Sequence, residues 1–303
     1  MCSSDLTFAT GSGTIKADNG GTLVVNATTG DMSQAILAGA SRMVLNGTYT
    51  LGSRINLSPG QTLELNGNYT TTTGFAVDAA TLRLGGTWRA TNTSIDVTNG
   101  GSLTFTTGGA TLDAVTLNTD LSLWQQGVSV LNGLTLNGNL SLGYEARVYF
   151  NGGSQTLGGS GSVDFANYER NSLVANADNS TLTIGSGITV RGGNRWIGDD
   201  YTGSVIGYNR WAGGGDNVSV VNLGTITADA AGRGIFVNPR GTGSVSTAGT
   251  LSAKSGGALH VGGGATMTGG TIAPSTGSSV VVLGDRKSTR LNSSHLVISY
   301  AVF

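Results

Sequence analysis

The sequence predicts an all-β protein, a right-handed single-stranded parallel β-helix (a solenoid) with coils of about 19–25 residues. Three observations predict this fold: the composition, the short alternating strand patterns and an internal repeat. Glycine supplies 51 of 303 residues, proline only 3, and charged residues 11%, against about a quarter in average domains. Hydrophobic residues still reach 38%, which excludes a disordered glycine-rich linker.

Short runs with alternating apolar residues recur along the chain, each bounded by Gly, Asn, Asp or Ser. Examples are Thr22–Asn26, Thr62–Asn66 and Thr181–Gly185. Such alternation is typical of strands with one buried face. Residues 31–43 alone have a helix-like spacing and an N-cap residue, so one short helix packed on a coil is an open alternative there.

The repeat defines the coil. The segment Leu45–Tyr49 recurs at Leu65–Tyr69 and again at Leu84–Trp88, in nearly equal steps. A later motif is found at Gly224–Ala228, Gly249–Ala253 and Gly270–Pro274, in slightly longer steps. A period near 20 with two or three short strands predicts one coil of a parallel β-helix, whose strands pair with the coils above and below. Roughly fourteen coils fit residues 7–284 at this period.

Turn residues agree with that coil. Glycine and asparagine tolerate the positive φ angles that sharp corners require. Asn46 and Asn66 lie one coil apart, so we expect their side chains to stack as a ladder.

The two ends of the chain differ from the rest. Residues 1–6 and 285–303 resemble translated sequencing-adapter DNA on either side of residues 7–284. We therefore expect residues 7–284 to be one β-helix fragment of a longer protein. Without the ends, the chain loses its only cysteine, Cys2, and keeps His260 as its only histidine.

Charge limits the possible partners. Removing Arg286, Lys287 and Arg290 from the 16 basic residues leaves 13, and removing Asp5 and Asp285 from the 17 acidic residues leaves 15. A nearly neutral segment has no basic stripe for phosphates, which argues against nucleic acid as a partner. A Cys/His metal site lacks ligands, and we expect no metal and no cofactor. Any outer-membrane anchor is expected outside residues 7–284.

Three segments carry a family resemblance: Leu182–Arg191, Val221–Ala228 and Gly249–Leu259. They resemble very large secreted bacterial β-helix repeat proteins, namely autotransporter passengers, filamentous-haemagglutinin-like adhesins and exported repeat proteins with a C-terminal sorting signal. The resemblance covers most of residues 43–284. It implies export and an extracellular position at the bacterial cell surface, but no particular ligand, because fold and function separate.

Pectinolytic enzymes share this fold and use carboxylates as general acid and base. Asn118–Asp120 and Gly198–Asp200 match two motifs of polygalacturonase-like hydrolases in letters. They lie about four coils apart, whereas that family places them about one coil apart, and its Gly-His-Gly and Arg-Ile-Lys motifs are missing. The sequence therefore favours a protein that is not an enzyme. A carbohydrate-active β-helix hydrolase or lyase is the alternative.

Residues 191–217 interrupt the coil pattern and contain two of the four Trp, two of the eight Tyr, three Arg and an adjacent Asp pair. Aromatic faces beside hydrogen-bonding Asp, Asn and Arg suit sugar rings, and loops on a rigid scaffold often carry function. The candidate glycan-binding residues are Arg195, Trp196, Asp199, Asp200, Tyr201, Tyr208, Asn209, Arg210 and Trp211. The structural alternative is that these aromatics only cover one side of the coils. A thinner aromatic stretch contains Tyr144, Tyr149, Tyr168 and Arg147.

Two weaker signals favour structural roles. Gly158–Asp164 approaches a calcium-binding nonapeptide, but its Asp falls one place late, so a turn is predicted. His260 alternates with buried neighbours and is predicted to be a solvated strand residue.

Together these observations predict an adhesive or structural shaft, secreted or surface-displayed, with surface glycans or extracellular matrix as candidate partners. A passive spacer that binds nothing is a third possibility.

Overall fold

The computed structural model describes residues 15–283, except for 32–34, 52–53, 72, 86–88, 92, 107–108 and 264. The adapter-like segments 1–6 and 285–303 lie outside the described residues. The described strands are stacked in parallel as a β-solenoid of about 11 turns, without a helix, which confirms the predicted all-β fold class. Among these residues there is no candidate transmembrane helix.

The chain forms two compact units. The first contains the residues up to Leu121 together with Val128–Val130, and the second contains Ser122–Gly127 and the residues from Leu131 onward. Strand β14 (Gly127–Leu136) has residues in both.

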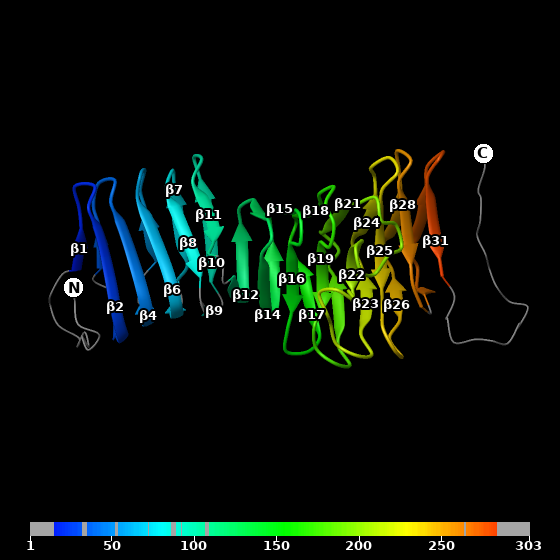
Figure 1. Ribbon diagram of the computed structural model, residues 1–303, viewed down its shortest axis with the longest axis horizontal. Helices are drawn as coiled ribbons and strands as arrows, with labels where there is room; N and C mark the ends of the chain where they lie inside the picture. The colour runs from blue at the N-terminus through cyan, green and yellow to red at the C-terminus, as the bar shows by residue number, and fades with distance from the viewer. Residues whose placement is uncertain are drawn as a thin grey trace, which may run out of the picture. The chain divides into compact units, whose positions relative to one another are not determined.

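In the first unit, parallel strands stack into a five-stranded sheet (Figure 1). In spatial order these strands are β11 (Ser102–Phe105), β8 (Thr81–Gly85), β6 (Thr62–Thr71), β4 (Arg42–Leu51) and β2 (Thr22–Asp31). A second set of strands comprises β5 (Ile55–Leu57), β7 (Phe75–Asp78), β9 (Arg89–Thr91), β10 (Ser94–Thr98) and β12 (Ala110–Asn118). Strand β1 (Ile15–Ala17) pairs with β3 (Ala35–Leu37).

In the second unit, the strands form three parallel ladders. The first ladder comprises β13 (Leu121–Leu123), β15 (Asn139–Leu142), β18 (Ser162–Phe165), β21 (Thr189–Gly192), β24 (Thr225–Ala228), β27 (Thr250–Ala253) and β30 (Thr271–Pro274). The second comprises β16 (Arg147–Phe150), β19 (Ser172–Ala175), β22 (Ser204–Gly207), β25 (Gly234–Asn238), β28 (Ala258–Val261) and β31 (Ser279–Val282). The third comprises β17 (Gln155–Gly158), β20 (Thr181–Ile184), β23 (Ser219–Asn222), β26 (Val245–Thr247) and β29 (Thr266–Met267).

The strand register confirms the repeats read from the sequence. Leu45 pairs with Leu65, and Thr225 pairs with Thr250. Two turns are longer than the predicted coil: Ser162 pairs with Thr189, and Thr189 pairs with Thr225. Because of such long turns, the solenoid has about 11 turns rather than the predicted fourteen.

The helix considered for residues 31–43 is wrong for the part of that segment that the structure describes. Ala35–Leu37 forms strand β3, and Arg42 begins β4. Strand β3 pairs in parallel with β1, so its backbone hydrogen-bonding groups are satisfied by a neighbouring turn rather than within a helix. Tertiary pairing therefore overrides the local helix-like spacing.

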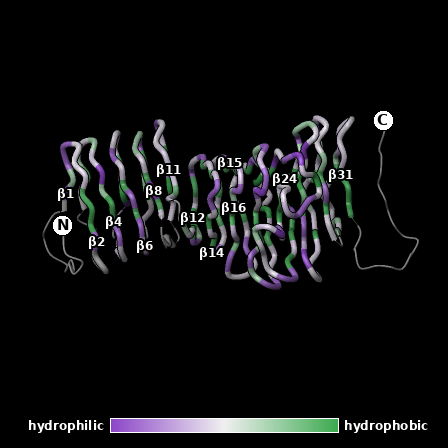
Figure 2. Tube along the Cα trace, viewed as in Figure 1, coloured by the Kyte–Doolittle hydropathy of each residue, from purple (hydrophilic) through white to green (hydrophobic). Residues whose placement is uncertain are grey.

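The core consists of alternate side chains that point inward from each strand. In β18, Val163 and Phe165 are buried, whereas Ser162 and Asp164 are half-buried. Figure 2 shows this pattern as hydrophobic stretches along the strands and hydrophilic residues in the connecting turns. As predicted, many corners have positive φ at Gly or Asn.

The predicted asparagine ladder is present in the first unit. The side-chain amide of Asn66 donates to the Asn46 side-chain oxygen at 3.1 Å, and that of Asn46 donates to the Asn26 side-chain oxygen at 2.6 Å. Asn46 therefore joins two neighbouring turns with its side chain.

Replacing Asn46 by alanine should lower the free energy of unfolding by about 1–2 kcal/mol, because two hydrogen bonds between turns are lost. Urea unfolding followed by circular dichroism measures this change. Thr104→Ala is the control: Thr104 is exposed on β11 of the same sheet, and its loss should change stability by less than about 0.5 kcal/mol. Equal stability of the two variants would contradict a stabilising ladder.

Candidate functional site

The predicted interruption at residues 191–217 consists of two loops separated by a buried strand. Strand β22 lies within it, and all four residues of β22 are buried. The first loop, residues 193–203, connects β21 to β22, and the second, residues 208–218, connects β22 to β23. Both loops therefore start and end on the solenoid scaffold, which fixes their bases.

The first loop is held by Asn194, whose side chain is buried. Its backbone forms a two-way bridge with Gly234, at 3.2 and 2.7 Å. Its side-chain amide donates to the carbonyl oxygens of Tyr168 and Thr202, at 3.0 and 2.8 Å. Its side-chain oxygen accepts the Trp196 backbone N–H at 2.9 Å. One amide side chain thus fixes the position from which Trp196 projects.

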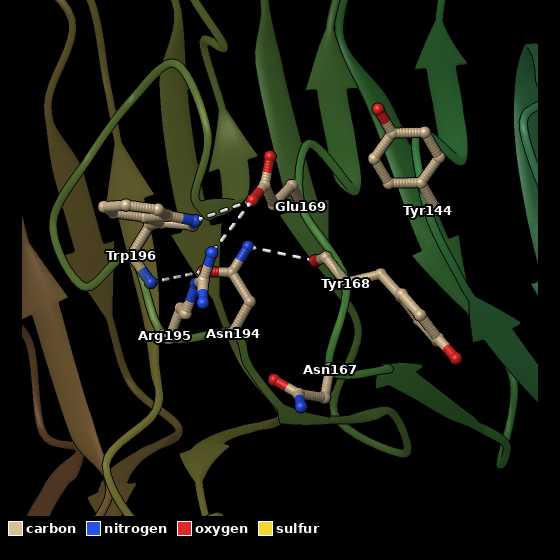
Figure 3. A pocket seen from close by; sticks show the side chains of 7 residues that line it. All are labelled: Tyr144, Asn167, Tyr168, Glu169, Asn194, Arg195 and Trp196. Carbon is tan, nitrogen blue, oxygen red and sulfur yellow. Dashed lines mark hydrogen bonds and ion pairs between the residues drawn. The ribbon is translucent and has the colours of Figure 1, made fainter.

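A pocket of about 380 Å³ opens beside this loop. It is lined by Tyr144, Asn167, Tyr168, Glu169, Asn194, Arg195 and Trp196. In Figure 3, Trp196 lies on one side of Glu169, and the two tyrosines lie on the other. The indole N–H of Trp196 donates to the Glu169 carboxylate at 3.1 Å, and Arg195 forms an ion pair with the same oxygen at 3.5 Å.

The aromatic side chains around the pocket are unusually exposed. Trp124 is 49% exposed, Tyr168 46% and Trp196 40%. Trp124 meets Tyr168 edge to face at 4.5 Å between ring centroids and is tilted against Tyr144 at 6.2 Å. Large apolar surfaces that remain in water in such a group are typical of binding sites. Their chemistry, flat faces beside an amide, a carboxylate and a guanidinium, suits sugar rings.

The second loop packs into a stack of cations and rings. Trp211 lies under the guanidinium groups of Arg147 and Arg170, at 4.4 and 5.2 Å from its ring centroid. The ring of Tyr201 lies under those of Arg170 and Arg210, at 5.2 and 5.3 Å. The stack connects both loops to the neighbouring turns, and each such contact contributes about 0.5–2 kcal/mol.

Arg170 is the centre of this stack. Its guanidinium donates to the Glu145 carboxylate at 2.9 Å, and this hydrogen bond raises the pKa of Arg170. Its backbone N–H donates to the Thr202 carbonyl at 3.0 Å. Arg170 therefore positions the first loop by backbone and side chain together.

Asp199 and Asp200 hold the loops and do not line the pocket. The Asp199 carboxylate accepts the Tyr201 backbone N–H at 2.8 Å and the Thr202 hydroxyl at 2.5 Å. Burial raises the pKa of Asp199, but these hydrogen bonds and the charge of Arg210 outweigh it and hold that pKa below its usual range. Asp200 forms an ion pair with Arg210 at 3.3 Å.

Two further predicted residues also have structural roles. Asn209 is fully buried, and its side-chain oxygen accepts the backbone N–H groups of Trp211 and Ala212, at 2.9 and 2.8 Å. Tyr208 lies under the guanidinium of Arg240 at 3.9 Å, outside the pocket.

Of the nine predicted residues, Arg195 and Trp196 line the pocket, and the other seven support the loops or lie nearby. The structure joins them to Tyr144 and Tyr168 of the thinner aromatic stretch. Sequence reasoning missed Trp124, Asn167, Glu169 and Asn194. A signal for the first was available, since the aromatic residues at positions 124, 144, 168 and 196 follow one another in steps close to the coil period.

His260 corrects one prediction. It lies on β28 as expected, but it is half-buried rather than solvated, because the first loop covers it. A Cβ at Gly198 would lie 2.4 Å from its Nδ1 atom, and Gly198 has φ +72°, so a larger residue here would strain the loop and displace the imidazole. Burial lowers the pKa of His260.

Within the described residues, no group of three or more His, Cys, Asp or Glu side chains is placed to hold a metal ion. The sequence matches no protein family model, and no curated protein and no solved structure is significantly similar to it.

Proposed function

We propose that this β-solenoid is part of an adhesive shaft, secreted or displayed at a bacterial cell surface, which binds glycans in the pocket between Tyr144 and Trp196. The observation that carries the proposal is the group of three exposed aromatic side chains, Trp124, Tyr168 and Trp196, around a pocket with polar groups. Export and surface display follow from the sequence resemblance and remain part of the proposal.

Sugar binding requires flat apolar faces and hydrogen-bonding groups that are already oriented. Trp196 supplies an oriented face, since Asn194 fixes its backbone and Glu169 accepts its indole N–H. The amide of Asn167 is exposed, and the largely exposed guanidinium of Arg195 pairs with Glu169 and lies 4.8 Å from the Trp196 ring centroid, so both groups border the face that a sugar would meet. The site therefore offers a preorganised face, so little side-chain entropy is lost when a sugar binds.

The aromatic residues differ in what they contribute. Trp196 is exposed and faces the pocket, whereas Trp211 is half-buried between two arginines. A change at Trp211 would therefore disturb the loops as well as any ligand, and a change at Trp196 is the cleaner test.

Trp196→Ala should weaken glycan binding at least tenfold, because loss of one stacking face costs about 1.5 kcal/mol or more. Binding of the purified protein is measured on an array of bacterial, plant and animal glycans, and affinities for the glycans it retains are measured by calorimetry.

Met267→Ala is the matched control, since Met267 is 44% exposed on β29 and does not line the pocket. It should bind like the unchanged protein. Equal affinities of the Trp196 and Met267 variants would contradict the proposed site. Binding to nothing on the array would favour a passive spacer, and release of shortened products from a bound polysaccharide would favour the enzyme alternative.

A further inference from the structure

Four aromatic residues, three of them exposed and Tyr144 half-buried, follow the ends of consecutive strands in one ladder. Trp124 follows β13, Tyr144 follows β15, Tyr168 follows β18 and Trp196 follows β21, and these four strands are neighbours in the order β13-β15-β18-β21. Each of these four turns therefore contributes one aromatic side chain that follows its strand in this ladder.

The spacing of the turns sets the length of this row. Parallel strands lie about 4.8 Å apart, so four consecutive turns span about 14 Å along the stacking direction. Three of the rings form one cluster, because Trp124 lies 4.5 Å from Tyr168 and 6.2 Å from Tyr144 between ring centroids. Trp196 lies on the other side of Glu169 (Figure 3), and Asn194 links its backbone N–H to the backbone carbonyl of Tyr168. The strands that carry these side chains therefore span more than a single sugar ring.

Charge at the row is balanced. Of the side chains that line the pocket, only Glu169 and Arg195 are charged, and they form an ion pair with each other. Arg170 and Arg210, nearby in the stack, are likewise paired with Glu145 and Asp200. The lining of the pocket therefore carries no excess charge that would favour an acidic or a basic ligand.

We infer that the site binds an internal stretch of a linear, uncharged glycan of at least three sugar units, lying along the stacking direction of the turns. This inference rests on the proposed glycan-binding function and adds the ligand's shape, length and charge. Sugar rings stack on the cluster of Trp124, Tyr144 and Tyr168 at one end and on Trp196 at the other, with Glu169, Arg195 and Asn167 bonding hydroxyl groups between them. A site for a terminal sugar would need one enclosed ring position, whereas the aromatic side chains in and beside this pocket come from four turns.

The test is an affinity series with oligosaccharides of one to six units. The probes are cello-oligosaccharides and chito-oligosaccharides as uncharged chains, with galacturonic acid oligomers as the acidic comparison. Calorimetry should show at least a tenfold gain in affinity from one to four units in an uncharged series, and little gain beyond. The acidic tetramer should bind at least tenfold more weakly than the uncharged tetramer.

Trp124→Ala supplies a second readout, because Trp124 lies at the end of the row farthest from Trp196. It should lower affinity for the tetramer at least fivefold more than affinity for the dimer. Trp124 is 49% exposed, so the variant should keep its fold, which circular dichroism checks. Tyr168→Ala, at an interior turn, should lower the affinity for both the dimer and the tetramer.

Two negative outcomes are distinguishable. Binding that depends on Trp196 but is equal for one and four units, or is stronger for the acidic chain, would overturn this inference and leave the glycan-binding function in place. Absence of binding at every length, in every series, would overturn both.

Discussion

Phe165→Ala is expected to lower the free energy of unfolding by about 3–5 kcal/mol, because a large buried ring is lost and a cavity remains. Phe165 is 1% exposed and is among the largest fully buried side chains. In the ladder it lies between Leu142 and Gly192, so neighbouring turns on both sides lose contacts. Urea unfolding followed by circular dichroism measures the change.

Phe165→Ala should also disturb the position of the residues that line the pocket. Residues 167–170, which supply Asn167, Tyr168, Glu169 and Arg170, closely follow this side chain in the sequence. Thr156→Ala is the control, because Thr156 is exposed on β17 and should change stability by less than about 0.5 kcal/mol. A Phe165 variant as stable as the Thr156 variant would mean that the inward face of β18 is wrongly assigned.

Gly193→Ala should lower the free energy of unfolding by about 3 kcal/mol or more, because it distorts the first loop, and it should abolish glycan binding. Gly193 has φ +118°, which L residues rarely adopt, and an added Cβ would lie 2.5 Å from the Gly234 carbonyl oxygen. The methyl group would therefore push apart the Asn194–Gly234 bridge that sets the direction of Trp196. Unfolding and glycan affinity are measured on the same preparation.

The matched control is Gly153→Ala, which separates backbone strain from collision. Gly153 has nearly the same φ, +114°, but no atom lies within 4 Å of its added Cβ. This variant should lower the free energy of unfolding only by the strain of the unfavourable φ, about 1–3 kcal/mol, and it should bind glycan as the unchanged protein does. If both variants lose the same stability and both still bind glycan, the close approach of Gly193 to Gly234 does not hold the loop.

Much of the fold follows from local patterns in the sequence. The motif Leu45–Tyr49 and its copy at Leu65–Tyr69 are in register because one turn has one period, and the Asn46–Asn66 contact follows from the same register. Tertiary pairing decided the open alternative at residues 35–37 in favour of a strand, and the loops between Thr189 and Thr225 lengthened a turn beyond the expected coil, so the number of turns was predicted too high. Neither the pairing with β1 nor the length of a loop is encoded in a short window of sequence.

The sequence by itself determined the all-β solenoid, the stacking of its repeats and the aromatic segment that contains Arg195 and Trp196. Only the tertiary structure decided which residues surround them. Trp124 and Glu169 come from earlier turns of the chain, and Glu169 accepts the indole N–H of Trp196. It also decided that Asp199 and Asp200 hold the loops. The physical reason is that strand register repeats from turn to turn and can be read from a period, whereas loops take their partners from whichever turns they pack against.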